Sequence, residues 1–334
     1  MGGIVMTRYV KPFLTIDEQI DRLLSRGMTL ERDVAEQWLR NVGYYRMSGY
    51  WYPYRALASS GEPKRLDRFT EETAFGHVVE LYEFDRKLRT LIHDGIERVE
   101  VAVRAQLSYL LGEKGSLSYK DHKNFRESFS LTQWLETAEQ RVRRVRKHSE
   151  AIQHHDRVYG GKLPIWVISD VLDFADVSKL YAGLKSDDQQ QIAERLGIAV
   201  KVSDLAKKHR KKFSRMHPFA RWLEQLTVLR NVCAHHSRVW NRHFTPSSTV
   251  ALRTIDDLRA LPCSQSDKLY GALTMISFLL QRVSPGASWS SKVSELIEES
   301  FMVIPKRSIS EMGFPESWSS EKLWSRGASL DRKL

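Results

Sequence analysis

Cysteine is scarce in this sequence. The 334 residues include two cysteines, Cys233 and Cys263, which are too few for the disulfide framework of a small secreted domain and fit a reducing compartment. The N-terminus lacks the long apolar core of a signal peptide. The longest apolar stretch, at 269–283, is interrupted by polar residues and is too short to span a bilayer. These absences predict a cytoplasmic protein with no membrane segment.

Sustained alternation of polar and apolar residues is also missing, so few β-strands are expected. No internal repeat is visible. Apolar residues instead recur every three or four positions, which indicates helices. The strongest pattern, from Phe75 to about Gly112, predicts two helices with a break near Asp94 and Gly95. Further helices are predicted at 15–25, 30–41, 131–148, 187–196, 269–283 and 293–301, and from Pro164 and Pro218 onward.

The fold class that follows is mainly α, a multi-helix bundle. Three parts are expected: an N-terminal helical and aromatic region at 11–70, a helical core at 71–245, and C-terminal helices with a tail at 246–334 that pack on the core as an appendage. Two roles are open for the aromatic residues at 43–55. They either fill a core or an interface, or stack on unpaired bases.

Positive charge exceeds negative charge. The chain has 52 Lys and Arg against 41 Asp and Glu, a net charge of +11, which favours a polyanionic partner, nucleic acid first and an anionic membrane surface second. Two basic runs could follow an RNA backbone, with salt-dependent binding, or could be solvated helix faces. Their candidate RNA-binding residues are Arg141, Arg143, Arg144, Arg146 and Lys147 in the first run, and Lys207, Lys208, Arg210, Lys211 and Lys212 in the second.

The composition of one predicted helix changes at the segment RNVCAHHSRVWNR, 230–242. Up to Leu229 the helix has an apolar stripe, and polar and basic residues then follow. At about 100° per residue, one helical stripe contains Asn231, His235, Arg238 and Arg242. Arg230 lies beside this stripe and reaches it on a long side chain. An amide, an imidazole and up to three guanidinium groups would then converge on one patch, which suits a phosphodiester.

These side chains could cleave RNA without a metal. Imidazole transfers protons near neutral pH, arginine binds phosphate through two hydrogen bonds, and RNA supplies its own nucleophile, the 2′-hydroxyl. The products would be a 2′,3′-cyclic phosphate and a 5′-hydroxyl. A single histidine leaves either the base or the acid unfilled. A second copy of the motif from a two-fold partner would fill it, so the sequence predicts a homodimer with a shared site.

Each of these features has a simpler alternative. Arginine, asparagine and histidine at a helix end are often a solvated face or a C-terminal cap. The CAHH tetrapeptide lacks the second ligand pair that a zinc site needs, so no metal and no other cofactor is expected. In the segment 97–104, Glu100 and Arg104 are spaced for an intrahelical ion pair. An acidic residue of this segment could instead position Arg230 or His235.

RNVCAHHSRVWNR resembles the signature of Abi-family abortive-infection proteins of the AbiD/AbiF type, which belong to the HEPN superfamily. Three further blocks agree in order, and the resemblance covers about 11–244: GYYRMSGYWYPY, LYEFDRKLRTLIHDGIERVEVAVRAQLSYLLG and LPIWVISDVLDFADVSKLY. It implies a helical HEPN-type fold that dimerises across the motif. In the matching pattern Arg230 contacts phosphate, Asn231 is the polar residue and His235 is the acid–base group, with His236 as an adjacent candidate.

The resemblance also implies a function. It points to an endoribonuclease toxin of phage defence with RNA as its substrate, and with a small RNA as an expected inhibitory partner. The alternative is a non-catalytic RNA-binding HEPN protein, a scaffold of a toxin–antitoxin or defence system whose Arg–His patch only holds phosphate. A third hypothesis is an interaction protein whose basic character is incidental.

Overall fold

The computed structural model describes residues 12–58 and 65–325. Within them the chain has thirteen α-helices and two small antiparallel sheets, β1 with β2 and β3 with β4. The mainly α-helical fold class predicted from the sequence is confirmed. No helix in this part of the chain is both long and apolar enough to cross a bilayer.

Two compact units can be distinguished along the chain. The first consists of the described residues up to Phe84 together with Ser300–Arg307, and the second of Asp85–Glu299 together with the described residues from Ser308 onward. The division falls inside helix α4, Phe75–Glu113. The three-part division expected from the sequence stays a prediction, and its outermost positions, Lys11 and 326–334, lie outside the described residues.

The first unit is built around short helices with aromatic packing. Thr15 accepts the backbone N–H of Glu18, whose carboxylate accepts the Thr15 N–H, so these two residues form a capping box at the start of α1. Of the aromatic segment, Tyr50, Trp51 and Tyr54 are buried, which favours the packing role for them. The elements are α1 Ile16–Ser25, α2 Arg32–Asn41, α3 Tyr44–Trp51, β1 Arg55–Leu57 and β2 Arg65–Phe69.

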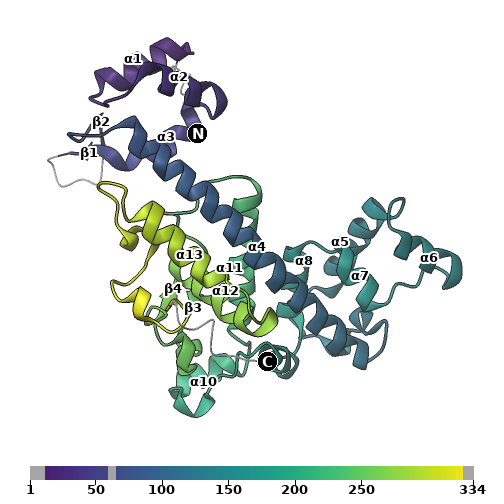
Figure 1. The fold of residues 1–334 in the computed structure, drawn as a ribbon. Coiled ribbons are helices and arrows are strands. Elements are labelled where there is room, and N and C mark those ends of the chain that lie inside the picture. Colours follow the sequence, from purple (N-terminus) through teal and green to yellow (C-terminus); the bar gives the residue numbers. More distant parts are fainter. Residues whose placement is uncertain (1–11, 59–64, 326–334) are drawn as a thin grey trace, which may run out of the picture. The chain divides into compact units, whose positions relative to one another are not determined.

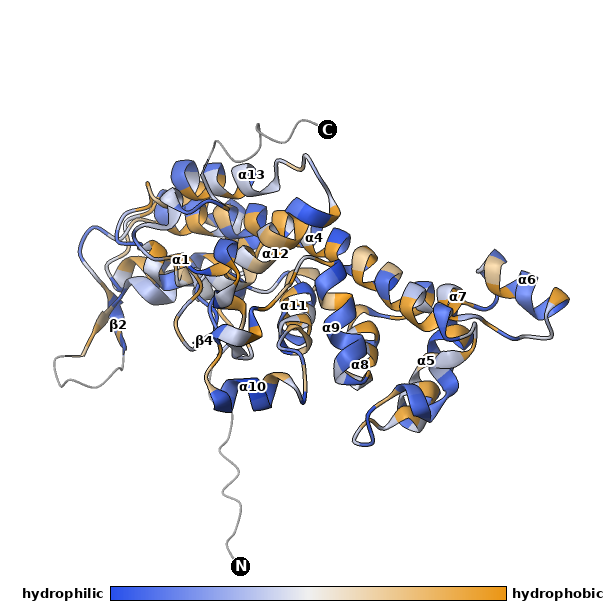
Figure 2. Ribbon diagram, turned by 90° about the horizontal axis from the view of Figure 1, so that it is seen from below, coloured by the Kyte–Doolittle hydropathy of each residue, from blue (hydrophilic) through white to orange (hydrophobic). Residues whose placement is uncertain are grey.

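The second unit has α12, Leu269–Val283, at its centre. All residues from Leu269 to Leu280 are buried, and this helix is largely hydrophobic (Figure 2), whereas the sequence predicted an amphipathic helix. The C-terminal segment packs against it, since the Tyr270 and Phe314 rings lie 4.8 Å apart. The other elements are α5 Leu131–Val145, α6 Glu150–Val158, α7 Ile165–Val171, α8 Phe174–Gly183, α9 Ser186–Arg195, α10 Lys207–Phe213, α11 Phe219–Ala234, β3 Ser247–Ser248, β4 Gln265–Ser266 and α13 Trp289–Leu296.

Helix α4 is continuous, so the break predicted near Asp94 and Gly95 is wrong (Figure 1). Gly95 serves packing and not a turn. A Cβ added there would lie 2.7 Å from Cγ2 of Ile276 and 2.8 Å from Nε1 of Trp289. The missing side chain lets the buried Trp289 approach the helix, where its indole N–H donates to the Leu91 carbonyl at 2.7 Å.

Replacing Gly95 with alanine is therefore expected to destabilise the protein by about 1–3 kcal/mol, because the core has no space for the added methyl group. Gly76, in the same helix, is the matched control. A Cβ there meets nothing within 4 Å, so Gly76→Ala should be neutral or stabilising by up to about 1 kcal/mol. Urea unfolding of both variants measures the difference. Equal stabilities would contradict the close approach at Gly95.

Candidate active site at the end of helix α11

Helix α11 ends inside the motif. The His236 N–H donates to the Cys233 carbonyl and the Ser237 N–H to the Val232 carbonyl, both at 2.9 Å. His236 has a φ of 56°, in the left-handed region. This combination is a Schellman motif, the hydrogen-bonded ending in which a left-handed residue reverses the chain. Glycine is the usual residue at that position, and histidine tolerates it better than most side chains.

The helical stripe predicted from the sequence is therefore wrong beyond Ala234. Asn231 lies in the last turn of α11, and the His235 N–H still donates to its carbonyl at 3.0 Å. Arg238 and Arg242 follow the chain reversal and are not on the helix. The sequence misleads here because 235–237 contains neither glycine nor proline.

The end of α11 presents polar side chains to solvent. Asn231, His235, His236 and Arg242 are exposed, and Arg230 is half-buried. The side chains of the intervening residues 232–233 and 239–240 are buried. The structure thus leaves three candidate catalytic side chains accessible to a substrate, on a backbone that is anchored on both sides of the chain reversal.

The anchor is Asp85, on α4. This fully buried carboxylate accepts the backbone N–H groups of Val239, at 3.1 Å, and Trp240, at 2.9 Å. It also forms an ion pair with Arg89, which is 5% exposed and lies one turn further along the helix. A buried ion pair that caps two backbone donors fixes the segment directly after the motif, because leaving any of these groups unpaired in the interior is costly.

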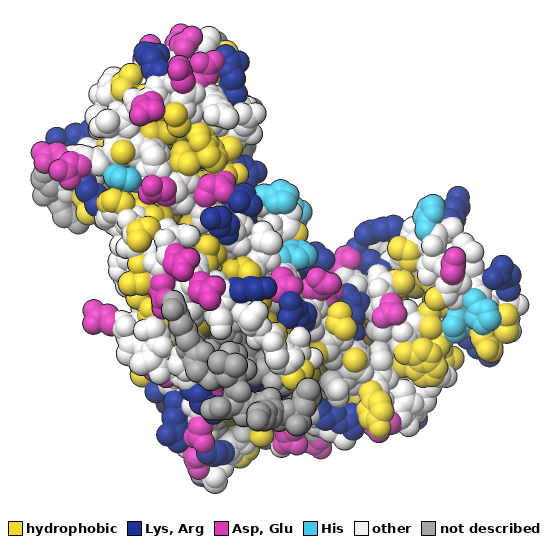
Figure 3. Space-filling view, in the orientation of Figure 1, with side chains coloured by type: hydrophobic (Ala, Val, Ile, Leu, Met, Phe, Trp, Pro, Cys, Tyr) yellow, Lys and Arg dark blue, Asp and Glu magenta, His cyan; other side chains and the backbone are white. Residues whose placement is uncertain are grey.

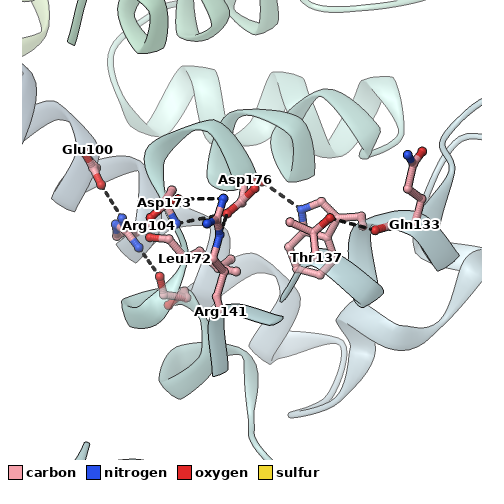
Figure 4. A network of polar contacts seen from close by, with 10 residues as sticks. Glu100, Arg104, Gln133, Thr137, Arg141, Leu172, Asp173 and Asp176 are labelled. Carbon is pink, nitrogen blue, oxygen red and sulfur yellow. Dashed lines mark hydrogen bonds and ion pairs between the residues drawn. The ribbon is translucent and has the colours of Figure 1, made fainter. Parts of the chain in front are cut away.

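Asp85 is not among the site residues predicted from the sequence. Its signal is a carboxylate on an apolar helix face, since Asp85 precedes Leu88 and Ile92 at the three- and seven-residue spacing of the buried stripe. The acidic residues considered instead have other partners. Glu100 pairs with Arg104, as the intrahelical alternative predicted, and Arg104 also donates to the Leu172 carbonyl at 2.7 Å (Figure 4).

Cys233, in the middle of the motif, is buried as a neutral thiol. Burial raises its pKa to about 12, with a further increase from the Asp85 carboxylate that Arg89 opposes. A thiol in this state is a poor nucleophile and a poor metal ligand. In the described ranges no group of three or more histidine, cysteine, aspartate or glutamate side chains is arranged to hold a metal ion.

The first basic run is largely engaged in ion pairs. Arg141 contacts Asp173 at 2.7 Å and Asp176 at 2.9 Å (Figure 4). Arg146 pairs with Asp156 at 2.8 Å and Arg143 with Glu139 at 3.3 Å. RNA binding by this run stays a prediction, and its exposed members are Arg143, Arg144 and Lys147.

The second basic run forms α10 and is exposed. Lys207, Lys208, Lys211 and Lys212 are all exposed, and dark-blue Lys and Arg side chains gather over this helix (Figure 3). Arg210 is also exposed, although it donates to the Leu205 carbonyl at 2.7 Å. Of the two runs, α10 is the one whose predicted RNA-binding residues are all exposed.

His217 supports the start of the motif helix and was not singled out from the sequence. Its Nδ1 accepts the Phe219 backbone N–H at 3.2 Å, and the backbone N–H of His217 donates to the Gln189 side-chain oxygen at 2.9 Å. The side chain is 1% exposed. Burial lowers the pKa of His217 to about 4, so this imidazole is neutral at physiological pH.

Because His217 is buried and neutral, the free energy of unfolding is expected to fall in mild acid. The folded-state pKa of about 4 lies below the unfolded value of about 6.5, so the unfolded chain binds the additional proton. Stability is then fully present above about pH 6.5 and falls as the pH drops toward 4. Between pH 7 and 4.5 the wild type should lose about 2–3 kcal/mol more than His217→Asn, which keeps an acceptor for the Phe219 N–H. Urea unfolding at both pH values measures this, and equal losses would contradict a buried neutral histidine.

The chain was compared with known proteins. A family model described as Abi-like protein matches residues 37–241, which is more than half of the chain and includes Asp85, Arg89 and the motif up to Asn241. No curated protein and no solved structure matches.

Proposed function

We propose that this chain, which belongs to the Abi-like protein family, is a metal-independent endoribonuclease toxin that acts in phage defence. The family supports a role in abortive infection. The activity, the AbiD/AbiF type and the assignment to the HEPN superfamily are parts of the proposal.

One observation carries the catalytic proposal. The end of α11 leaves Asn231, His235 and His236 exposed beside Arg230, while buried Asp85 anchors the chain directly behind them. Accessible proton-transfer groups on a rigid support are what cleavage of a large polyanion requires, since misplaced groups lose much of the rate. A purely structural helix end would need neither two exposed imidazoles nor the left-handed histidine.

In the proposed reaction the 2′-hydroxyl attacks the adjacent phosphate, and each candidate residue has a separate role. Arg230 binds the phosphate oxygens and stabilises the charge that develops on them. His235 accepts the proton of the 2′-hydroxyl, and His236 is the adjacent candidate for this role. The exposed cations of α10 hold more distant phosphates along the strand. RNA is thus the substrate, and a small RNA that occupies the same surface would inhibit.

Two copies of the motif complete the site in this proposal. One cleavage event needs a base for the 2′-hydroxyl and an acid for the leaving 5′-oxygen. A homodimer with its two-fold axis at the end of α11 would bring two sets of Arg230 and His235 to one strand.

The second candidate function is RNA binding without cleavage. The observation that favours it is the exposed basic helix α10, because phosphate binding needs no proton transfer. The protein would then act as a defence or toxin–antitoxin scaffold.

Incubation of purified protein with total RNA in EDTA tests both functions. The proposal expects cleavage that leaves 2′,3′-cyclic phosphate and 5′-hydroxyl ends. Tight, salt-dependent binding without cleavage would favour the scaffold. Absence of any RNA affinity at low salt would exclude both.

A further inference from the structure

A further histidine, His243, follows the motif and contacts the carboxylate of Asp267. The Nδ1 atom of His243 lies 2.8 Å from Oδ2 of Asp267, with the two side chains 68% and 38% exposed. A carboxylate at Nδ1 orients the ring and selects the tautomer with the proton on Nδ1. Nε2 is then the nitrogen that exchanges a proton with a substrate.

Hydrogen bonds to the backbone next to His243 and next to Asp267 hold the two residues beside each other. Directly after the histidine, the Phe244 N–H donates to the Asp267 carbonyl at 2.7 Å. The buried side chain of Gln225, on α11, donates to the carbonyls of Thr245, at 2.7 Å, and Ser266, at 2.9 Å. One side chain of the motif helix therefore fixes the chain two residues after the histidine and one residue before the aspartate.

The same contacts give the direction of the segment after His243. Gln225 binds Thr245, and Ser247 donates to the Arg221 carbonyl at 3.1 Å, so the chain runs back along α11 from its C-terminal end. Because His243 precedes Thr245, we expect it between Gln225 and the C-terminal end of α11. Two extended residues span about 7 Å, and the rise from Gln225 to Arg230 is about 7.5 Å. An extended chain at 243–245 would therefore place His243 alongside the last turns of α11.

We infer that His243 is the general acid of the site and that Asp267 is its positioning residue. The inference rests on the proposed function. His235 takes the proton from the 2′-hydroxyl, the 2′-oxygen bonds to phosphorus, the bond from phosphorus to the 5′-oxygen breaks, and protonated His243 gives its Nε2 proton to that oxygen. Exchange with water restores both imidazoles.

This role supplies the acid from the chain that carries the base, as an alternative to the second copy of His235 in the proposed dimer. The carboxylate of Asp267 at Nδ1 leaves Nε2 of His243 as the nitrogen that exchanges the proton. The family match ends at Asn241, so it assigns nothing to this pair.

The test uses full-length protein and a fluorescent RNA oligonucleotide. His243→Asn keeps an N–H for Asp267 but transfers no proton, and is expected to lower kcat by ~10²- to 10⁴-fold with KM nearly unchanged. Asp267→Asn should lower kcat about tenfold, and the double variant should be no slower than His243→Asn, because Asp267 acts through the histidine. The matched control is His155→Asn on α6, a half-buried histidine whose Nδ1 contacts the Ala151 carbonyl at 2.8 Å, which should cleave at the wild-type rate.

Chemical rescue separates proton transfer from a structural effect. Added imidazole should restore part of the activity of His243→Gly and none of that of Arg230→Ala. Wild-type kcat in His243→Asn, alongside inactive Arg230→Ala, would overturn this inference and leave the proposed function standing. A slow His243→Gly that imidazole does not accelerate would also overturn it. Wild-type protein that binds RNA without cutting it would overturn both.

Discussion

His235→Ala is expected to reduce RNA cleavage by ~10²- to 10⁴-fold, because it removes one proton-transfer group. The fold should be unaffected, since the side chain is exposed and its residue contributes a backbone N–H to the helix end. Such surface changes usually alter stability by less than about 0.5 kcal/mol. Cleavage in EDTA, RNA affinity and thermal unfolding are measured on the same protein. A variant that is folded, binds RNA and cleaves at the wild-type rate would contradict the assignment.

The neighbouring residues need different substitutions. His236 has a left-handed backbone, so His236→Gly removes the imidazole without adding strain, whereas alanine would keep a Cβ in a conformation that costs about 1 kcal/mol. Cleavage by His236→Gly would assign the role of the base to His235 and not to His236. Arg230→Lys keeps the positive charge but loses the two-pronged contact with phosphate, and activity between that of wild type and Arg230→Ala is expected.

The sequence predicts the local features of this chain well. The mainly helical fold follows from three- and four-residue periodicity, and the capping box at Thr15 and Glu18 follows from two residues that are close in sequence. The same rules fail at Gly95 and at His236. A glycine can serve close packing with Trp289, and a helix can end on a left-handed histidine. Both outcomes depend on the tertiary partner and not on the local sequence.

The site depends mostly on pairs that are distant in sequence. Asp85 meets Val239 across 154 positions, and Arg141 meets Asp176 across 35. The sequence of the first basic run therefore does not show that acidic residues outside its helix form ion pairs with part of it. His243 and Asp267 are 24 positions apart, and nothing in either local sequence indicates the other. Exposed functional residues can be read from a motif, whereas the residues that orient them require the fold.

Asp85→Ala is expected to have the largest effect on stability, about 3–5 kcal/mol, because it leaves the Arg89 charge buried without this partner. It also leaves the N–H groups of Val239 and Trp240 without their acceptor. The matched control is Asp94→Ala on the same helix. Its partner Arg98 is also four residues away, but the two side chains are 44% and 37% exposed, so a loss below about 1 kcal/mol is expected.

A double variant separates the buried charge from the backbone cap. Asp85→Ala with Arg89→Met removes both charges and should be more stable than Asp85→Ala alone, because an apolar side chain replaces a buried cation that has lost its Asp85 partner. It should still cleave RNA slowly, since the chain behind the motif remains unanchored and the imidazoles lose their fixed positions. Urea unfolding and kcat are compared for the three proteins. Equal losses in Asp85→Ala and Asp94→Ala would contradict the buried anchor, and full activity of the double variant would show that His235 needs no support from α4.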